Sequence, residues 1–501
     1  MKNTAIRFYI FTLVATLFIG VCFTSADFLT IPVDGFKDLM VVVAQWAVVV
    51  GTLYLAVTAI AVNRYIFAIL FPIITIFSSM LAWFRFTINA TLTPMILDAA
   101  LQNDIRTSAD LISPGLLLLM LSAIAVSFIL TYYRWHRIAI RYPQAHALIA
   151  ISLLLAINSI GSLRRPISER IPFNIYYTTM RYLEERRTVA EVRRDLTDGI
   201  SGGYDDIDVV FVLGESLRPD HLGLNGYKRE TTPLLRREDV ISFPYIYTEQ
   251  TYTNRSVPHI LSRADSSDFS RAYSEKSFIH MFKACGFRTA WLANQEAADT
   301  YIYFMNEADT LIYANIDKSS YVFDRWVDGD LLPLFDDIMD RRGGRTLTIL
   351  HTIGSHWWYN SHFTDEFERF KPVVKSKVIS SCTSDEMINS YDNTVLYTDY
   401  FLSQLIERLR ERNAILIYQS DHGESLGEDG VWLHASDMEQ THSAAALIWM
   451  SPKYRMLHPE HYERARSNSE RYYRTDYLFH SILDAAGIKS PYIDNGLSVF
   501  R

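Results

Sequence analysis

The chain has 501 residues, more than one ordinary soluble core holds, and a net charge of −8 at pH 7. This acidic balance, without any basic low-complexity arm, gives no sign of nucleic-acid binding. The hydrophobic content of 49% is high for a purely soluble protein, and the excess lies before residue 165. The composition therefore indicates a membrane part followed by a soluble part.

Five apolar stretches precede residue 165, each close to the ~20 residues that a membrane-spanning helix needs. They cover residues 6–24, 39–62, 65–84, 114–131 and 145–163. We expect them to form a five-helix transmembrane bundle over residues 1–163. The alternative for the first stretch is a cleaved signal peptide, but four further spans follow it and no clear small-residue cleavage site is present.

Charged residues at the ends of these stretches predict the orientation of the bundle. Most of the basic residues would share one side: Lys2, Arg7, Arg64, Arg134, Arg137 and Arg141. The positive-inside rule then puts the N-terminus in the cytoplasm. With five spans, everything after residue 163 lies on the outside.

Two connecting segments have open interpretations. The external loop between the third and fourth spans, residues 89–113, contains Asn103, Thr107 and Asp110. This loop is either a solvated connector or a surface that binds a lipid headgroup. Residues 164–203 are charged and helix-prone until a Ser-Gly-Gly run breaks them, so we expect a bridge between the two parts.

After residue 203, short β-rich runs alternate with amphipathic helical stretches such as residues 387–410. The candidate strands are residues 209–213, 289–292, 346–350, 414–418 and 445–449. This alternation predicts one large α/β domain over residues 204–501 with a largely parallel central sheet.

Two of the candidate strands end in side chains that bind metals. Glu215 follows the strand at 209–213, and Asp421 and His422 follow the strand at 414–418. Open α/β sheets place their ligands at the C-terminal ends of strands. Carboxylate and imidazole together suit zinc. We therefore expect one metal site, built by two distant parts of the chain.

The three cysteines contain no CxxC pair, which argues against a cysteine zinc site. Cys22 lies in an apolar stretch, so at most one disulfide is open to the chain, between Cys285 and Cys382.

Two further loops carry reactive side chains, residues 249–258 with several hydroxyl groups and residues 351–356 with two histidines. Each loop alone is weak evidence, because a lone histidine or a threonine-rich turn is usually structural. Together with the metal ligands they fit phosphoryl transfer, in which a metal neutralises the phosphoryl oxygens and activates a hydroxyl nucleophile. Additional imidazoles could bind phosphate oxygens or protonate a leaving alkoxide.

Taken together, these residues resemble the phosphoethanolamine transferase family of the lipid A-modifying, colistin-resistance type. The runs that carry the resemblance are Gly214-Glu215-Ser216-Leu217-Arg218-Pro219-Asp220-His221, Tyr391-Asp392-Asn393-Thr394, and Asp421-His422-Gly423-Glu424-Ser425-Leu426-Gly427-Glu428 with His434. The resemblance implies an N-terminal five-helix transmembrane bundle and a C-terminal domain of the alkaline phosphatase/sulfatase-like α/β fold. It also implies a multi-pass inner-membrane protein whose catalytic domain faces the periplasm.

The resemblance assigns roles to individual residues. It implies that Zn²⁺ is the cofactor and that Thr253 is the nucleophile, with Thr251 as a rival in the same loop. The implied zinc ligands are Glu215, Thr253, Asp421 and His422. His356 and His434 match positions that bind the phosphoethanolamine phosphate or a second metal. Asn103 and Thr107 echo residues of the family that bind the lipid headgroup.

The implied reaction moves phosphoethanolamine from phosphatidylethanolamine to lipid A, or to another glycan of the cell envelope, through a phosphoethanolamine-threonine intermediate. The sequence departs from the family at two places. The nucleophile loop has Glu249 and Gln250 where relatives often have a cysteine. A lysine that is often found near the substrate is missing, and Asn294, Gln295 and Glu296 occupy that region.

Three alternatives remain open. A glycerol-phosphate polymerase on the same fold would also use a threonine and a metal. A sulfatase-like hydrolase would need Cys/Ser-x-Pro-x-Arg, and Ser256-Val257-Pro258-His259-Ile260 lacks the arginine. A membrane scaffold or sensor with a degenerate site is opposed by the intact set of Glu215, Thr253, Asp421 and His422.

Overall fold

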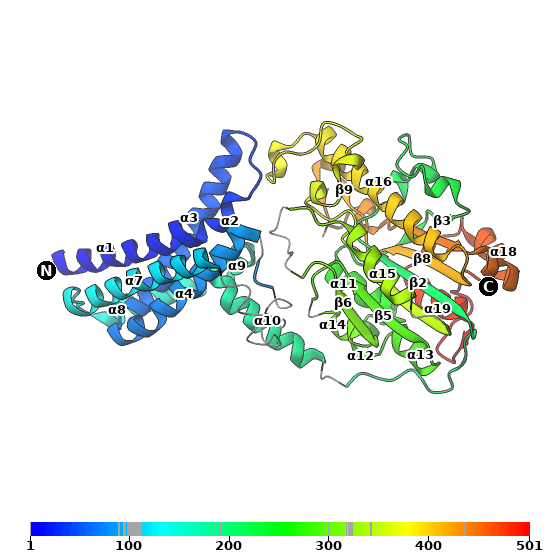
Figure 1. Ribbon diagram of the computed structural model, residues 1–501, viewed down its shortest axis with the longest axis horizontal. Coiled ribbons are helices and arrows are strands. Elements are labelled where there is room, and N and C mark those ends of the chain that lie inside the picture. Colours follow the sequence, from blue (N-terminus) through cyan, green and yellow to red (C-terminus); the bar gives the residue numbers. More distant parts are fainter. Residues whose placement is uncertain are drawn as a thin grey trace. The chain divides into compact units, whose positions relative to one another are not determined.

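The computed structural model, shown in Figure 1, describes residues 2–88, 91–93, 97, 113–189, 192–298, 300–316, 318, 324–340, 343–434 and 436–501. The chain divides into two compact units. The first contains Met1–Leu183 with Asp317–Asp324 and Lys375–Ser381, and the second contains the remaining residues. Asn103, Thr107 and Asp110 of the predicted headgroup-binding loop lie outside the described residues.

The first unit is helical. Its helices are α1 (Lys2–Ile19), the π-helical η1 (Gly20–Thr24), α2 (Ala26–Leu29), α3 (Phe36–Ala61), α4 (Arg64–Ile88), α7 (Pro114–Arg137), α8 (Pro143–Ser159), α9 (Gly161–Ser168) and α10 (Phe173–Val189). Many of their large apolar side chains are exposed, including Leu118, Phe128 and Leu148. Such exposure is expected where lipid replaces water as the solvent.

Four of the described helical segments are long and apolar enough to cross a membrane, and the number is five if a bent pair counts as one span. The four are Thr4–Thr24, Phe36–Ala61, Arg64–Thr87 and Pro114–Arg137, as predicted. The fifth prediction is met only by α8 and α9 together, which are bent by 98° at Ile160. Gly161 and the charged Arg164 follow this bend, and neither favours a continuous apolar helix.

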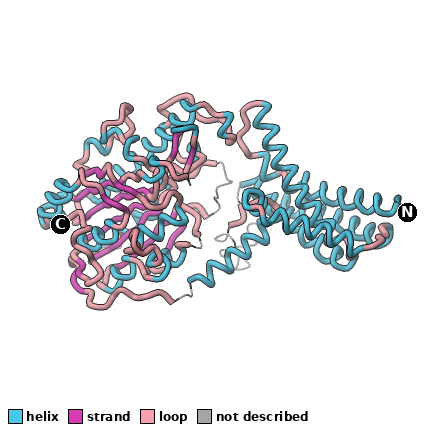
Figure 2. Tube along the Cα trace, turned by 180° about the vertical axis from the view of Figure 1, so that it is seen from behind, coloured by secondary structure: helices cyan, strands magenta, loops and turns pink. Residues whose placement is uncertain are grey.

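The second unit contains a seven-stranded sheet. In spatial order the strands are β3 (Ile241–Phe243), β11 (Ala446–Met450), β8 (Ala414–Ser420), β2 (Ile207–Gly214), β7 (Arg345–His351), β5 (Arg288–Ala293) and β6 (Thr310–Tyr313). The strands from β8 to β6 run parallel, whereas β11 is antiparallel to both of its neighbours. Figure 2 shows strands only in this unit.

Three two-stranded ribbons accompany the sheet. They pair β1 (Ser201–Gly202) with β13 (Ile488–Lys489), β4 (Ile246–Tyr247) with β12 (Tyr473–Arg474), and β9 (Ser425–Leu426) with β10 (Trp432–Leu433). The α-helices of this unit are α11 (Thr253–Leu261), α12 (Arg271–Ser274), α13 (Phe278–Ala284), α14 (Ile302–Met305), α15 (Leu331–Met339), α16 (Ser384–Leu409), α17 (Pro452–Leu457), α18 (Pro459–Asn468) and α19 (Tyr477–Ala485).

Strand β2 lies at the centre of the sheet and is buried along its whole length. Val209, Phe211 and Leu213 belong to the same apolar cluster as residues of α13 and α19. Val210 and Val212 alternate with them, point to the opposite face and are also fully buried. Both faces of the sheet are therefore covered, as is usual for parallel strands.

All five predicted strands are present, and so is the long helix predicted at 387–410, which is α16. Strands β3 and β6 were not predicted because each is short, with three and four residues, and lies at an edge of the sheet. Cys285 and Cys382 are not joined by a disulfide. The strand order places the C-terminal ends of β8, β2, β7 and β5 in a row, which is where the predicted ligands lie.

Candidate functional site

Asp421 is fixed by the ends of two neighbouring central strands. Gly214 at the end of β2 pairs with Ser420 at the end of β8. The backbone N–H of Asp421 donates to the Gly214 carbonyl at 3.1 Å. Asp421 Oδ1 in turn accepts from the backbone N–H groups of Ser216 at 3.1 Å and His422 at 2.8 Å. Oδ1 of Asp421 therefore accepts two backbone hydrogen bonds, and Oδ2 accepts neither of them.

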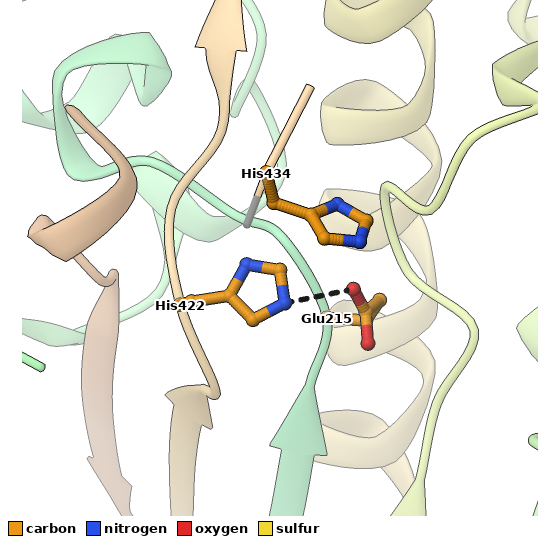
Figure 3. Close-up of side chains that lie close together, drawn as sticks. All are labelled: Glu215, His422 and His434. Carbon is orange, nitrogen blue, oxygen red and sulfur yellow. Dashed lines mark ion pairs between the residues drawn. The ribbon is translucent and has the colours of Figure 1, made fainter. Parts of the chain in front are cut away.

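The remaining polar atoms converge on one point. Asp421 Oδ2 and His422 Nε2 are buried and have no hydrogen-bond partner among the described residues. His422 Nε2 lies 3.4 Å from Asp421 Oδ2 and 3.4 Å from Glu215 Oε1, the pair joined by the dashed line in Figure 3. His422 Nδ1 lies 2.8 Å from the Gly423 carbonyl, which assigns its proton to Nδ1 and leaves a lone pair on Nε2. Two buried carboxylate oxygens that lie near the lone pair of one buried imidazole are donors of the kind that bind a divalent cation.

Thr253 is the first residue of α11, and its hydroxyl reaches the same cluster. Its Oγ1 donates to Glu215 Oε2 at 2.8 Å. Among the described residues, Thr251 makes no hydrogen bond to Glu215. The partial positive charge at the start of a helix favours negative charge on an oxygen there. Of the two candidate nucleophiles, Thr253 is therefore the one whose hydroxyl lies in the cluster.

His434 completes a group of three possible metal ligands with Glu215 and His422, whose ligand atoms all lie within 4.8 Å of one another. Figure 3 shows its ring beside His422, and the ring centroids are 4.7 Å apart. His434 Nδ1 lies 3.0 Å from Oε2 of the fully buried Glu424, and Tyr359 donates its hydroxyl to Oε1 at 2.7 Å. These contacts orient the imidazole.

The histidine at the end of β7, His351, and the histidine in the loop after it, His356, differ. The ring of His356 lies 5.8 Å from that of His434, so both predicted phosphate-binding imidazoles are on the same side of the cluster. His351 is 1% exposed and packs edge-on against the rings of Trp291 and Tyr301, each at 5.6 Å. His351 is therefore a core residue.

The pKa values of the two buried carboxyl groups, Glu215 and Asp421, are shifted in opposite directions. Burial alone would raise the pKa of Glu215, but His422, His356 and His434 outweigh it and hold that pKa well below its usual range. Burial and the Glu215 charge raise the pKa of Asp421 well above its usual value. Burial lowers the pKa of His422 to about 4, so this imidazole is neutral at pH 7 and can donate a lone pair. A bound cation would remove the repulsion between the carboxylates.

The turn after β8 leaves no space for a side chain at Gly423. A Cβ atom there would lie 2.0 Å from the Gln440 carbonyl oxygen and 2.4 Å from that of Ser443. On the other strand, Ser216 has a φ of 55°, in the left-handed region that non-glycine residues rarely adopt. Next to the candidate ligands, Gly423 is therefore constrained by lack of space and Ser216 by its backbone conformation.

Asp328 holds the loop after β7 against Glu215. Its Oδ1 accepts from Asn294 Nδ2 and from the Ile353 N–H, both at 2.8 Å, and its Oδ2 accepts from the Gly354 N–H at 3.0 Å. The next N–H along, that of Ser355, donates to the Glu215 carbonyl at 3.0 Å. Burial raises the pKa of Asp328 to about 6, against these hydrogen bonds.

Sequence reasoning missed several residues that support the cluster. Gln295 donates to Glu215, and Tyr359 reaches it only indirectly, through Glu424 and His434. Gln295 follows strand β5 closely, so the rule about strand ends could have found it. Tyr359 and Asp328 begin short 3-10 helices of three residues each, and no sequence pattern points to them.

Replacing Gly423 by alanine tests the tight turn. Gly423→Ala forces its methyl group into two backbone carbonyls, so we expect a loss of about 1–3 kcal/mol or more in the free energy of unfolding. The measurement is thermal unfolding of the full-length protein in detergent. Gly496→Ala is the control, because a Cβ there meets only the Asp494 carboxylate at 3.2 Å. Equal melting temperatures for the two variants would contradict the steric argument.

Asp328 predicts a pH dependence of stability. The folded protein keeps its carboxyl protonated up to about pH 6, whereas the unfolded chain ionises near the ordinary value of 3.8. The contribution of the protonated group to the free energy of unfolding is therefore complete below pH 3.8 and is lost as the pH rises through 6, by about 3 kcal/mol. Because Asp328→Asn does not titrate, the stability difference between wild type and variant should fall across this range. A constant difference would contradict the assignment.

Comparison with known proteins shows which proteins this chain resembles in sequence. The sulfatase family model matches residues 207–488. The Kdo(2)-lipid A phosphoethanolamine 7''-transferase of Escherichia coli is 34% identical over 260 residues, which cover 50% of this chain and 45% of that protein. The chain spans about half the length of the first curated relatives it matches.

Solved structures of phosphoethanolamine transferases resemble this chain in fold. The integral membrane lipooligosaccharide phosphoethanolamine transferase A of Neisseria meningitidis is 23% identical with a TM-score of 0.55, over 98% of this chain and 97% of that one. The zinc complex of the C-terminal periplasmic domain of EptC from Escherichia coli is 25% identical with a TM-score of 0.56, over 62% and 90%. With its apolar helices and its mostly parallel sheet, this chain belongs to the sulfatase family, within the alkaline phosphatase/sulfatase superfamily.

Proposed function

We propose that this protein transfers phosphoethanolamine from phosphatidylethanolamine to lipid A, or to another glycan of the cell envelope, through a covalent intermediate on Thr253. One observation carries the proposal. The Thr253 hydroxyl donates to Glu215, beside Asp421 Oδ2 and His422 Nε2, which have no hydrogen-bond partner in the part of the chain that the structure describes. The relatives named as phosphoethanolamine transferases support the same reaction.

Zinc is the metal we propose for this site. Its ligands would be Glu215, Thr253, Asp421 and His422, a set of oxygen and nitrogen donors that suits zinc. When bound, the ion would lower the pKa of a hydroxyl and offset the charge on the phosphoryl oxygens. The EptC relative that was solved as a zinc complex supports this choice.

In the first half-reaction, Thr253 Oγ1 attacks the phosphorus of phosphatidylethanolamine and the phosphorus–oxygen bond to diacylglycerol breaks. The Thr253 proton moves toward Glu215 Oε2, which already accepts its hydrogen bond at 2.8 Å. His434, which lies beside His422 and is oriented by Glu424, would contact a phosphoryl oxygen. The diacylglycerol oxygen takes up the proton that Thr253 gave to Glu215, so diacylglycerol leaves as the alcohol and Thr253 carries phosphoethanolamine.

In the second half-reaction, a hydroxyl or phosphate oxygen of the acceptor attacks the same phosphorus. The bond to Thr253 Oγ1 breaks, and that oxygen regains a proton. The two steps use one site and the same neighbouring imidazoles.

The cellular setting is part of the proposal. Residues 1–163 would span the inner membrane with the N-terminus in the cytoplasm, residues 164–203 would bridge, and residues 204–501 would work in the periplasm. Asn103 and Thr107 would contact the donor headgroup. Donor and acceptor are both amphipathic, so an enzyme with spanning helices shares their compartment.

Sulfate ester hydrolysis is less well supported, although the chain belongs to the sulfatase family. The serine that a sulfatase would modify corresponds to Ser256, and no arginine follows at the required spacing. Ser256 is buried, and its hydroxyl donates to the Gln250 carbonyl at 3.0 Å and to the Tyr252 carbonyl at 3.2 Å. Its oxygen is thus engaged with the loop backbone.

Substitution of Thr253 tests the covalent step. The full-length protein in detergent is incubated with phosphatidylethanolamine, and its intact mass is measured. Wild type should gain the mass of one phosphoethanolamine, and so should the control Thr251→Ala. Thr253→Ala should gain none and should lose transferase activity by about 10³-fold or more, since the nucleophile is gone. An adduct on Thr253→Ala would refute the assignment.

Metal analysis tests the ligand set. Asp421→Asn and His422→Ala each remove one donor, so the purified full-length variants should lose bound zinc. His280→Ala is the control, because this histidine pairs with Asp195 on the surface of the same unit. Zinc content equal to wild type in both ligand variants would rule out this site.

A further inference from the structure

We infer that Gln295 is a positioning residue of the metal centre, which holds the Glu215 carboxylate in the orientation that binds the cation. This inference rests on the zinc site of the proposed function. Gln295 lies where the sequence departs from the family, two residues after the end of β5. Its side chain is partly buried and its amide reaches across the sheet edge to Glu215.

Both N–H groups of the Gln295 amide are engaged. Nε2 donates to Glu215 Oε2 at 2.9 Å and to the Thr352 carbonyl at 2.8 Å. Because both partners are acceptors, the orientation of the amide is fixed: the reversed amide would place its oxygen against two other oxygens. The amide therefore acts as a donor in both directions.

The hydrogen bond from Gln295 to Thr352 makes its hydrogen bond to Glu215 rigid. Thr352 donates both its N–H and its hydroxyl to the Leu213 carbonyl, each at 3.0 Å. Leu213 lies in β2, two residues before Glu215. Through Gln295, the tip of the Glu215 side chain is thus tied to a point that is fixed relative to its own strand. The Glu215 backbone is held as well, by the Ser355 N–H at 3.0 Å.

The two oxygens of Glu215 therefore have separate tasks. Oε2 is taken by Gln295 and Thr253, whereas Oε1 accepts from the Ser216 hydroxyl at 2.6 Å and faces His422 Nε2. A carboxylate that hydrogen bonds already hold in place loses fewer orientations when it binds a metal. Gln295 supplies this hydrogen bond without a charge of its own, so the negative charge of Glu215 stays available to the cation.

Hydrogen bonds to metal-binding carboxylates from neighbouring residues typically change metal affinity by about 10–100-fold. Gln295→Met keeps the length of the side chain and removes both donors. We expect zinc affinity to fall by about 10–100-fold in this variant, measured on the full-length protein in detergent by competition with a chelator. Gln295→Asn keeps the donors on a shorter stem that cannot reach both partners, so its loss should be smaller.

Gln250→Met is the matched control. Gln250 lies in the nucleophile loop, and its contacts among the described residues are made by its backbone N–H and carbonyl. This variant should bind zinc as wild type does. The melting temperature of the metal-free protein provides a second readout, and Gln295→Met should leave it unchanged.

Two outcomes would overturn the inference. The first is a zinc affinity of Gln295→Met equal to wild type, and a lower melting temperature of the metal-free variant would then assign Gln295 to the fold alone. The second is an equal loss of zinc affinity in Gln295→Met and Gln250→Met. If wild type itself bound no zinc, the proposed function would fail instead.

Discussion

The structure depends on two buried carboxyl groups that are close enough to repel each other. Glu215 and Asp421 are at most 1% exposed, and the charge of Glu215 together with burial raises the pKa of Asp421. A protein keeps such a pair only where something offsets the charge, because an uncompensated buried charge costs several kcal/mol. The imidazoles of His422 and His434 stabilise Glu215, yet Asp421 Oδ2 stays without a hydrogen-bond partner among the described residues. Without a cation, this arrangement leaves two buried carboxyl groups that repel each other. A bound cation would offset their charge.

The sheet makes this arrangement possible. The ligands come from segments that are far apart in the sequence. Ser216, the neighbour of Glu215, and Asp421 are separated by 205 positions, yet they are joined by a hydrogen bond. The parallel pairing of β2 with β8 brings the two strand ends level, and β7 and β5 follow on the other side of β2. Each of these four strands delivers its own part: Glu215 from β2, the Asp-His pair from β8, the Thr352 carbonyl after β7, and Gln295 after β5. The strand order therefore sets the order of the side chains across the site.

The sequence predicted the parts of the site that follow from strands alone. Long apolar runs such as β2 and β8 are recognisable without a structure, and the side chains directly after them were expected to meet. It could not predict contacts that depend on which loops face each other. The Tyr359–Glu424–His434 chain and the Asp328 clamp join segments without periodic patterns. The bend at Ile160 was missed for a similar reason, because hydropathy averages over the one residue that leaves the helical conformation.

Family membership alone does not choose the reaction, because one fold supports several chemistries. The choice comes from which hydroxyl reaches the buried carboxylates. In the loop before α11 and its first turn, Ser256 donates to backbone carbonyls, whereas Thr253 donates to Glu215. A threonine cannot be converted to the aldehyde hydrate that sulfatases use, but it can carry a phosphoryl group as an ester. In the proposed reaction that ester is attacked again at phosphorus, so the outcome depends on what approaches it. An acceptor in the same membrane as the proposed donor lipid would compete with water for the ester.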